Sequence, residues 1–534
     1  MLSGWSIILI SFAYLGLLFA IAYFGDKTGA GSDRGKPIIY SLSLAVYCSS
    51  WTFYGAVGRA STSGWEFLAT YLGPIIVFIL GWHLIEKVIL ISKQQNITTI
   101  SDFISSRYGK SQSLAVMITV FAVLGTIPYL AMQLKAVAIS FNALTTTTDN
   151  PLSKGADTAL FVAMAMALFA ILFGTRHIDA TEHHRGLVLA VAFESIVKLA
   201  AFLAVGLFVA FEVFDGFDDL IFNVQTQLSY NDRFSTLLRE SFITETLLAS
   251  AAVICLPRQF HVTIVENTRT SDLKLARWLF PLYLLMMALF VLPISSAGGM
   301  IFNQDGIDAD TYVLMLPLAA GHEDLATFAF IGGLSASTSM VIVASITLAT
   351  MVCNDVIMPL LLRIPHLKLS ENKDLGALLL KVRRVTIICL MLLAYFYYRI
   401  LGDQGDLASF GLLAFVAVVQ FLPAMVGAII WKTASRQGVL AGLIGGYTLW
   451  VYTLLLPTLA SAGLTDSPFD SLDLPDWLNP LGLFGVDQFD PLTHGVIWSL
   501  SVNILLFIVV SRYTNLRLVD RIQASAFVDI YDQS

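Results

Sequence analysis

The sequence is short of charge. Only 13% of its 534 residues are Asp, Glu, Lys or Arg, about half of the roughly 25% that is usual in soluble proteins. Hydrophobic residues make up 57% of the chain, and the mean hydropathy is +0.76. Too little polar surface remains to enclose a water-soluble globule of this size, whereas a bilayer accommodates apolar surface. The composition therefore excludes an ordinary soluble enzyme and predicts a multi-pass protein surrounded by membrane lipid.

Several chemical signatures are also absent from the sequence. Its four cysteines lie far apart without CxxC or CxxH spacing, which argues against a disulfide framework and a zinc site. No polybasic block could meet the phosphates of a nucleic acid. There is no P-loop, HExxH or GxSxG pattern and no kinase nucleotide-binding segment, so we expect a non-enzyme that draws energy from an ion gradient. A passive channel is disfavoured because no ring of like charges or repeated filter segment occurs.

Long apolar runs, in contrast, are abundant. A membrane-spanning helix needs about 20 mostly apolar residues, and thirteen runs have about this length or more. They lie at residues 3–24, 38–58, 67–91, 113–142, 158–174, 186–214, 243–266, 277–302, 325–352, 382–401, 408–431, 437–457 and 493–511. The runs are continuous and not alternating, which predicts an all-α integral membrane protein with about 13 transmembrane helices.

The distribution of basic residues predicts the orientation. If the amino terminus is outside, 22 of the 31 Lys and Arg residues lie in inner connections and five in outer ones. Inner loops of membrane proteins carry the excess of Lys and Arg. We therefore expect the amino terminus outside and the carboxy terminus inside.

Two apolar runs contain many small and hydroxyl residues at hydrocarbon depth. Residues 38–58 include the segment SLSLAVYCSSWTFYGAVG, and residues 325–352 include GGLSASTS. One such helix is most simply explained by close helix packing. Two of them favour a second interpretation, in which hydroxyls and freed carbonyls bind a small dehydrated cation at the membrane midplane, as in secondary transporters.

Three further runs carry polar groups. Pro257 in ICLPRQFH either kinks its helix or exposes backbone groups that could hold a polar ligand. Gln133 suits an amino-acid or sugar ligand, or else an interhelical hydrogen bond. Glu194 and Lys198 stand four residues apart on one helical face, where they could neutralise each other or relay a proton.

Three segments together resemble the sodium/solute symporter family, which includes the bacterial proline, pantothenate and galactose symporters. They are ITTISDFISSRYG at 97–109, FLPAMVGAIIWKTASRQGVLAGLIGG at 421–446, and PRQFH at 257–261. In the last segment Gln259 and His261 match the family's Gly-Gln-Pro-His, while Phe260 replaces its proline. The resemblance implies a leucine-transporter-type core of two inverted five-helix repeats, at about 38–214 and 243–431, within a symporter-type domain at 1–511.

The resemblance also implies site residues. In the family, the first helix of repeat one and the third helix of repeat two hold a sodium ion. Aligning this chain assigns the carbonyls of Ala45 and Cys48 as sodium ligands. The partners on the second helix are either Ala336 with Ser339, or Ser337 and Thr338. The solute would bind near Tyr47, Ser50, Trp51, Gln133 and Gln259. Tyr47 stands where proline symporters have an aspartate, so a proton remains an alternative to Na⁺ as the coupling ion.

A finer resemblance comes from FGTRHIDATEHHRG at 173–186, AFESIVKLAAF at 192–202 and GGLSASTSMVIVASITLATMVCND at 332–355. These segments resemble the symporter-like domain of bacterial sensor histidine kinases that control carbon and nitrogen catabolism, whose solute is histidine. The implied function is cation-coupled import of an amino acid such as histidine across the bacterial inner membrane. The alternative is a sensory input domain that reports solute occupancy to a cytosolic kinase module through the last helix, at 493–511. The tail at 512–534, with RLVDRIQASAFVD at 517–529, resembles the start of the linker to such a module.

Overall fold

The computed structural model describes residues 4–28, 35–145, 157–174, 185–227, 239–302, 306–363, 375–401, 407–461 and 475–532. Their regular structure is helical, as expected where lipid offers no partners for backbone polar groups. The helices are α1 (Gly4–Thr28), α2 (Lys36–Ser43), α3 (Ala56–Ser63), α4 (Leu68–Ile79), α5 (Trp82–Gln95), α6 (Ile100–Arg107), α7 (Gln112–Leu144), α8 (Thr158–Gly174), α9 (Arg185–Phe208), α10 (Phe217–Gln227), α12 (Glu240–Cys255), α13 (Pro257–Phe260), α14 (Leu273–Leu289), α15 (Val291–Phe302), α16 (Tyr312–Ala319), α17 (Glu323–Met351), α18 (Met358–Leu362), α19 (Leu375–Leu401), α20 (Leu407–Val419), α21 (Leu422–Ile430), α22 (Arg436–Trp450), α23 (Leu456–Ser461), α24 (Pro491–Tyr513) and α25 (Leu518–Val528).

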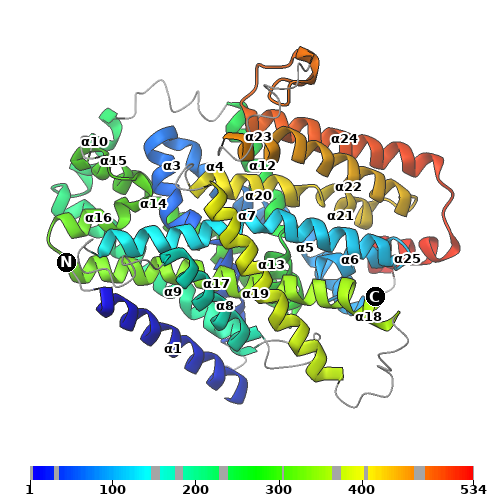
Figure 1. The fold of residues 1–534 in the computed structure, drawn as a ribbon, viewed down its shortest axis with the longest axis horizontal. Helices are drawn as coiled ribbons and strands as arrows, with labels where there is room; N and C mark the ends of the chain where they lie inside the picture. Colours follow the sequence, from blue (N-terminus) through cyan, green and yellow to red (C-terminus); the bar gives the residue numbers. More distant parts are fainter. Residues whose placement is uncertain are drawn as a thin grey trace.

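These helices form an elongated bundle and run broadly along its long axis (Figure 1). Helices α10, α15 and α16 gather at the end where α1 begins, whereas α6, α18 and α25 lie at the opposite end with the carboxy terminus. The two chain ends therefore lie at opposite ends of the bundle. An odd number of membrane crossings requires this arrangement, and which end faces outward stays a prediction.

The all-α membrane class is confirmed, but fewer helices qualify as spans than the thirteen expected. In the described part of the chain, nine segments are long and apolar enough, and a bent pair makes a tenth. The run at 158–174 forms α8, whose 17 residues are short for a span. The runs at 38–58 and 67–91 contribute to one qualifying segment, 51–79, although Gly64, with φ of +56°, ends α3 within it. The run at 382–401 lies in α19.

The run at 38–58 is a broken helix. Helix α2 continues through the 3₁₀ turn η1 (Leu44–Tyr47), and Cys48 is extended, with φ of −75° and ψ of 98°. The π-helical turn η2 (Trp51–Gly55) then leads into α3. Because a helix end leaves backbone carbonyls and amides without helical partners, this break exposes polar backbone inside the bundle.

The run at 243–266 is broken too. Helix α12 ends at Cys255, and Leu256 is extended, with φ of −65° and ψ of 126°. Helix α13 and the π-helical turn η5 (His261–Val265) follow at an angle of 53°. The residue before a proline disfavours the α conformation, and proline fits the first position of a helix. Pro257 therefore places the break at Leu256, so that Gln259 and His261 lie in the second half.

Continuous helices enclose the two breaks. Helix α17 packs against α7 and α9, and α20 packs against α7. Helix α17 contains the predicted cation helix at 325–352. It is unbroken and continues into the π-helical turn η8 (Val352–Ile357). These contacts bring the polar residues of α7, α9 and α17 to the first broken helix.

The tail helix α25 docks at the end of the bundle that carries α6. The ring of Phe527 lies 5.2 Å from that of Phe103 on α6. Lys87 Nζ on α5 donates to the carbonyl of Val528 at 2.9 Å, and Lys432 pairs with Asp529 at 2.8 Å. The tail is therefore part of the folded unit. The domain and repeat boundaries stay predictions, and residues 175–184 of the FGTRHIDATEHHRG motif lie outside the described residues.

Candidate functional site

A buried lysine fills the break of the first helix. The side chain of Lys198 on α9 is fully buried. Its Nζ donates hydrogen bonds to the carbonyls of Ala45, at 2.6 Å, and Cys48, at 2.7 Å. Charge-assisted bonds of this kind are about twice as strong as neutral ones. The two carbonyls that the sequence assigns to sodium thus already hold a positive charge, the ammonium group of Lys198.

One turn earlier on α9, Glu194 connects to the predicted cation helix. Its carboxylate accepts a hydrogen bond from Thr338 Oγ1 on α17 at 2.6 Å. Helix α17 is also joined to α1 by a hydrogen bond between the hydroxyls of Ser335 and Tyr14. Glu194 and Lys198 influence each other electrostatically, so α9 carries a buried acid–base pair between the broken helix and α17.

The other α17 candidates satisfy their hydroxyls within their own helix. Ser337 Oγ donates to the carbonyl of Gly333 at 3.1 Å, and Ser339 Oγ donates to that of Ala336 at 3.3 Å. Such back-bonds are common for serine inside helices and do not consume the acceptor lone pairs of the hydroxyl. The sodium assignments on this helix stay predictions.

The Lys198 ammonium occupies the position predicted for sodium at these two carbonyls. Sodium binding by the carbonyls of Ala45 and Cys48 would require the Lys198 ammonium to move away, since two cations cannot share two carbonyls at hydrogen-bond distance. In the arrangement described here, the residues fit a tethered ammonium at this position and not a metal ion.

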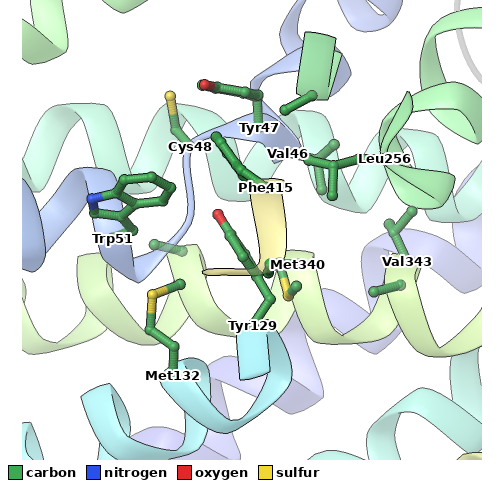
Figure 2. Packing of buried hydrophobic residues seen from close by; sticks show 14 of the residues in the cluster. Val46, Tyr47, Cys48, Trp51, Tyr129, Met132, Leu256, Met340, Val343 and Phe415 are labelled. Atoms are coloured by element: carbon green, nitrogen blue, oxygen red, sulfur yellow. The ribbon is translucent and has the colours of Figure 1, made fainter. Parts of the chain in front are cut away.

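Aromatic rings line the broken segment and include two predicted solute residues (Figure 2). Trp51 lies 4.8 Å from Phe415 and 6.4 Å from Tyr129, measured between ring centroids. Tyr129 and Phe415 stack in parallel at 5.9 Å. Tyr47 packs on the same Phe415, but its hydroxyl points elsewhere and donates to the carbonyl of Thr70 at 2.9 Å. The structure thus brings Tyr47 and Trp51 to one aromatic cluster.

Two more predicted solute residues bond directly to each other. Gln133 Oε1 on α7 accepts from the backbone amide of Ser50, at 3.2 Å, and from its hydroxyl, at 2.7 Å. Tyr129, one turn before Gln133, bonds through its hydroxyl to Ser49 at 2.7 Å. Helix α7 therefore satisfies the polar groups at the start of η2.

Gln259 joins the two broken helices. Its Nε2 donates to the carbonyl of Leu44 at 3.2 Å, while the Tyr40 hydroxyl donates to the carbonyl of Thr263 at 2.7 Å. Because a carbonyl can only accept, the amide nitrogen of Gln259 must face Leu44, which leaves Oε1 on the other side. Within the described residues this buried oxygen has no hydrogen-bond partner.

Arg258, the neighbour of Gln259, is buried with 1% of its surface exposed. Its guanidinium carbon lies 4.2 Å from the centroid of the Tyr129 ring, so it stacks on the aromatic cluster. None of its three side-chain nitrogens has a hydrogen-bond partner among the residues that the structure describes.

A cavity connects the aromatic cluster to a cluster of charges. It measures about 10 Å³, room for about one water molecule, and is lined by Trp51, Thr52, Ala56, Arg59, Phe67, Thr70, Glu245, Ala408 and Leu412. At its far end Arg59 pairs with Glu245 at 2.7 Å and with Glu66 at 3.0 Å. The cavity thus runs from Trp51 to an ion-paired cluster that joins α3, η3 (Gly64–Phe67) and α12.

Sequence reasoning missed several members of this site. Lys198 was assigned only to a pair with Glu194, and its bonds to the broken helix depend on how α9 packs. Arg258 carried a detectable signal, because an ionisable residue in a membrane span indicates a functional site by default. Tyr129 and Phe415 gave no such signal, since aromatic residues are common in apolar runs.

Comparisons with known proteins agree with this fold. No protein-family model matches the chain. A protein of Bacillus subtilis (strain 168) described as the uncharacterized symporter YhjB is 22% identical over 442 residues, which cover 81% of this chain and 83% of that protein. The structure of a Na⁺-coupled sialic acid symporter, in a substrate-bound outward-open state, superposes with a TM-score of 0.64 at 14% identity, over 97% of this chain and 99% of that one. A manganese transporter of Eremococcus coleocola matches at a TM-score of 0.47.

The superposition on the sialic acid symporter establishes the fold. The chain has the all-α architecture of a membrane transporter along nearly its whole length. At 14% identity this likeness concerns architecture alone, and the site of this chain has to be judged from its own residues.

Proposed function

We propose that this protein is a cation-coupled secondary transporter that imports a small solute, an amino acid such as histidine, by alternating access. The observation that carries the proposal is the buried polar centre where two broken helices meet. Gln259 and Tyr40 join the two broken helices by direct hydrogen bonds. Gln133 on α7 and Lys198 on α9 bond to residues at the break of the first of these helices. Discontinuous helices that expose backbone near the midplane are how secondary transporters bind solutes and ions.

The proposed path of the solute follows the cavity beside Trp51. With the amino terminus outside, the cluster of Arg59, Glu66 and Glu245 lies at the outer mouth and has to open before the solute reaches the aromatic rings. Solute binding would then favour closure, because only a difference in affinity between two states can shift their balance.

Na⁺ and H⁺ are both candidates for the coupling ion. The two carbonyls assigned to sodium hold the ammonium group of Lys198. This contact favours a mechanism in which no sodium ion occupies that pair of carbonyls.

Uptake into proteoliposomes tests the proposal. Labelled histidine is offered under an imposed sodium gradient, an imposed proton gradient, or neither. We expect accumulation that depends on one of the two gradients. If neither gradient drives uptake of histidine, proline or any other small solute tested, the transport proposal is wrong.

A sensory input domain is the second candidate function, and the docked tail helix favours it. Helix α25 contacts α6 through Phe527 and α5 through the carbonyl of Val528. A change in these helices on solute binding would therefore reach the tail and any signalling module attached to it. Transport and sensing are compatible, because one helix movement can serve both. A kinase domain in the reading frame downstream of this segment would support sensing.

A further inference from the structure

The buried guanidinium of Arg258 has no counterion in contact among the residues that the structure describes. Isolated buried charges are strongly unfavourable, and buried polar groups in proteins are nearly always paired. Within the described residues, however, Nε, Nη1 and Nη2 of Arg258 all lack hydrogen-bond partners. An unmet buried group of this kind calls for a partner that arrives later, such as a ligand.

The surroundings of Arg258 make the electrostatic imbalance larger. The nearby buried cation, Lys198, interacts unfavourably with Arg258, and its ammonium is already bonded to carbonyls. The carboxyl group that interacts with Lys198 is that of Glu194, which accepts a hydrogen bond from Thr338. If all three groups are ionised, the centre carries one excess positive charge, and a ligand with one negative charge would balance it.

The position of Arg258 fits a ligand-binding role. It lies directly after Pro257 at the break of the second helix, and its guanidinium stacks on Tyr129 at 4.2 Å. A guanidinium placed over a ring face is attracted to the ring and keeps its five N–H donors available. A planar guanidinium with free donors binds a carboxylate through two parallel hydrogen bonds. The adjacent Gln259 adds an unpartnered acceptor, Oε1, which suits an N–H donor on the same ligand.

We infer that Arg258 binds the carboxylate of the transported solute and that Gln259 Oε1 accepts a hydrogen bond from an N–H group of the same molecule. The inference rests on the proposed transport function and names the residues that recognise its substrate class. The solute carries a carboxylate and an N–H donor close together, as an amino acid does. Sugars, polyamines and other solutes without a carboxylate are excluded.

Binding to the purified full-length chain tests the inference. The probes are the twenty common L-amino acids and, for each one that binds, the matching amide and amino alcohol, which lack the carboxylate. We expect amino acids to raise the denaturation temperature and their neutralised analogues to have no effect. Arg258→Met should weaken binding of the best amino acid at least about 30-fold, or about 2 kcal/mol at 1.4 kcal/mol per tenfold change. Arg258→Lys keeps the positive charge but cannot form two parallel hydrogen bonds with a carboxylate. Its affinity should fall between those of the unmodified chain and Arg258→Met.

A matched control is Arg107→Met. Arg107 is also buried, but its guanidinium donates to the carbonyls of Ala428 and Trp431, at 3.2 and 2.7 Å. Losing these bonds should lower the denaturation temperature and leave amino-acid affinity unchanged. Arg258→Met should instead weaken amino-acid binding without lowering the denaturation temperature. The unliganded variant loses a buried charge but none of the hydrogen bonds that the described residues make. A loss of affinity that merely follows lost stability would contradict the inference.

The outcomes separate the two proposals. Equal binding of an amino acid and its amide, or full affinity in Arg258→Met, would show that Arg258 does not bind a solute carboxylate. Gradient-driven uptake would in that case still support the transport proposal. If no amino acid binds but another solute is taken up along a gradient, the substrate class is wrong and the transport proposal stands. If nothing binds and nothing is taken up, both are wrong.

Discussion

At the scale of single residues, the site is organised by side chains that serve the backbone. Lys198 and Gln133 come from unbroken helices and bond to polar groups that the break at Cys48 leaves exposed. Because unmet backbone groups in an apolar interior each cost about 1–3 kcal/mol, these residues stabilise a break that would otherwise be unfavourable. Whether they also act in transport is open to direct tests.

Replacing Lys198 tests the tethered cation. In the unmodified chain we expect amino-acid binding to change less than about twofold when NaCl is replaced by choline chloride. In Lys198→Ala the carbonyls of Ala45 and Cys48 lose their cation, so binding should weaken in choline and recover with added sodium. Binding is followed by scintillation proximity with a labelled amino acid.

The matched control is Lys87→Ala. Lys87 Nζ also donates to two backbone carbonyls, those of Ile429 and Val528, but at the end of the bundle. It should show no sodium effect. Strong sodium dependence in the unmodified chain would contradict the prediction, because sodium would then act while Lys198 is present, either at these carbonyls after the ammonium leaves or at another site.

Replacing Gln133 tests the predicted solute residue. Gln133→Ala removes the acceptor that holds Ser50, and we expect solute affinity to fall about tenfold, in line with one lost buried hydrogen bond to a polar group. Gln420→Ala is the control, because Gln420 is equally buried and bonds to Ser499 and Asn503, away from the site. The prediction is wrong if both variants lose affinity to the same degree.

At the scale of the elements, the small residues on α17 act first through packing. A Cβ added at Gly333 would lie 1.9 Å from the hydroxyl of Tyr54 on η2, and one added at Gly332 would lie 2.5 Å from Ala201 on α9. The close approach of α17 to the first broken helix therefore requires glycine. This packing explains part of the GGLSASTS pattern without any ligand.

Gly333→Ala should accordingly destabilise the chain. Overpacking of a tight helix contact costs typically about 1–3 kcal/mol, so we expect a clear fall in the denaturation temperature in detergent. Gly299→Ala on α15 is the control, since nothing lies within 4 Å of its added Cβ and alanine favours helix. Equal stability of the two variants would mean that α17 can move away from η2 at little cost.

At the scale of the whole molecule, the tail helix ties the carboxy-terminal segment to the end of the bundle. Phe527 contacts α6, and Asp529 pairs with Lys432 in the turn after α21. Any rearrangement of these elements during a transport cycle must either carry α25 along or release it.

Hydrogen exchange on residues 518–528 tests this coupling. If the chain reports solute occupancy, protection of the α25 amides should change on addition of a bound amino acid, and Phe527→Ala should lower their protection in its absence. The comparison helix is α10, at the opposite end of the bundle. Unchanged α25 protection with saturating solute would argue against the sensory reading while leaving transport untouched.

Much of this architecture could be read from the sequence, because hydrophobic periodicity and backbone chemistry act locally. Each expected run coincides with helical structure, and Pro257 marks a break because proline constrains its neighbour wherever it stands. The number of spans was less predictable. Whether residues 51–79 count as one span or two depends on Gly64, whose positive φ ends α3 in a way that hydropathy does not record.

The sequence by itself determined that the chain must be embedded in a lipid bilayer, that its backbone must be helical, and which few polar residues must be buried. Scarce charge and an unsatisfied backbone allow no other solution in a bilayer. Only the tertiary structure decided the partners of those residues. Lys198 and Cys48 are 150 positions apart, and Arg258 and Tyr129 are 129 apart, so their contacts depend on how whole helices pack. Packing gave Lys198 two carbonyls and left the nitrogens of Arg258 without a hydrogen-bond partner in the described part of the chain, since partners at such separations follow from the three-dimensional arrangement and not from local sequence.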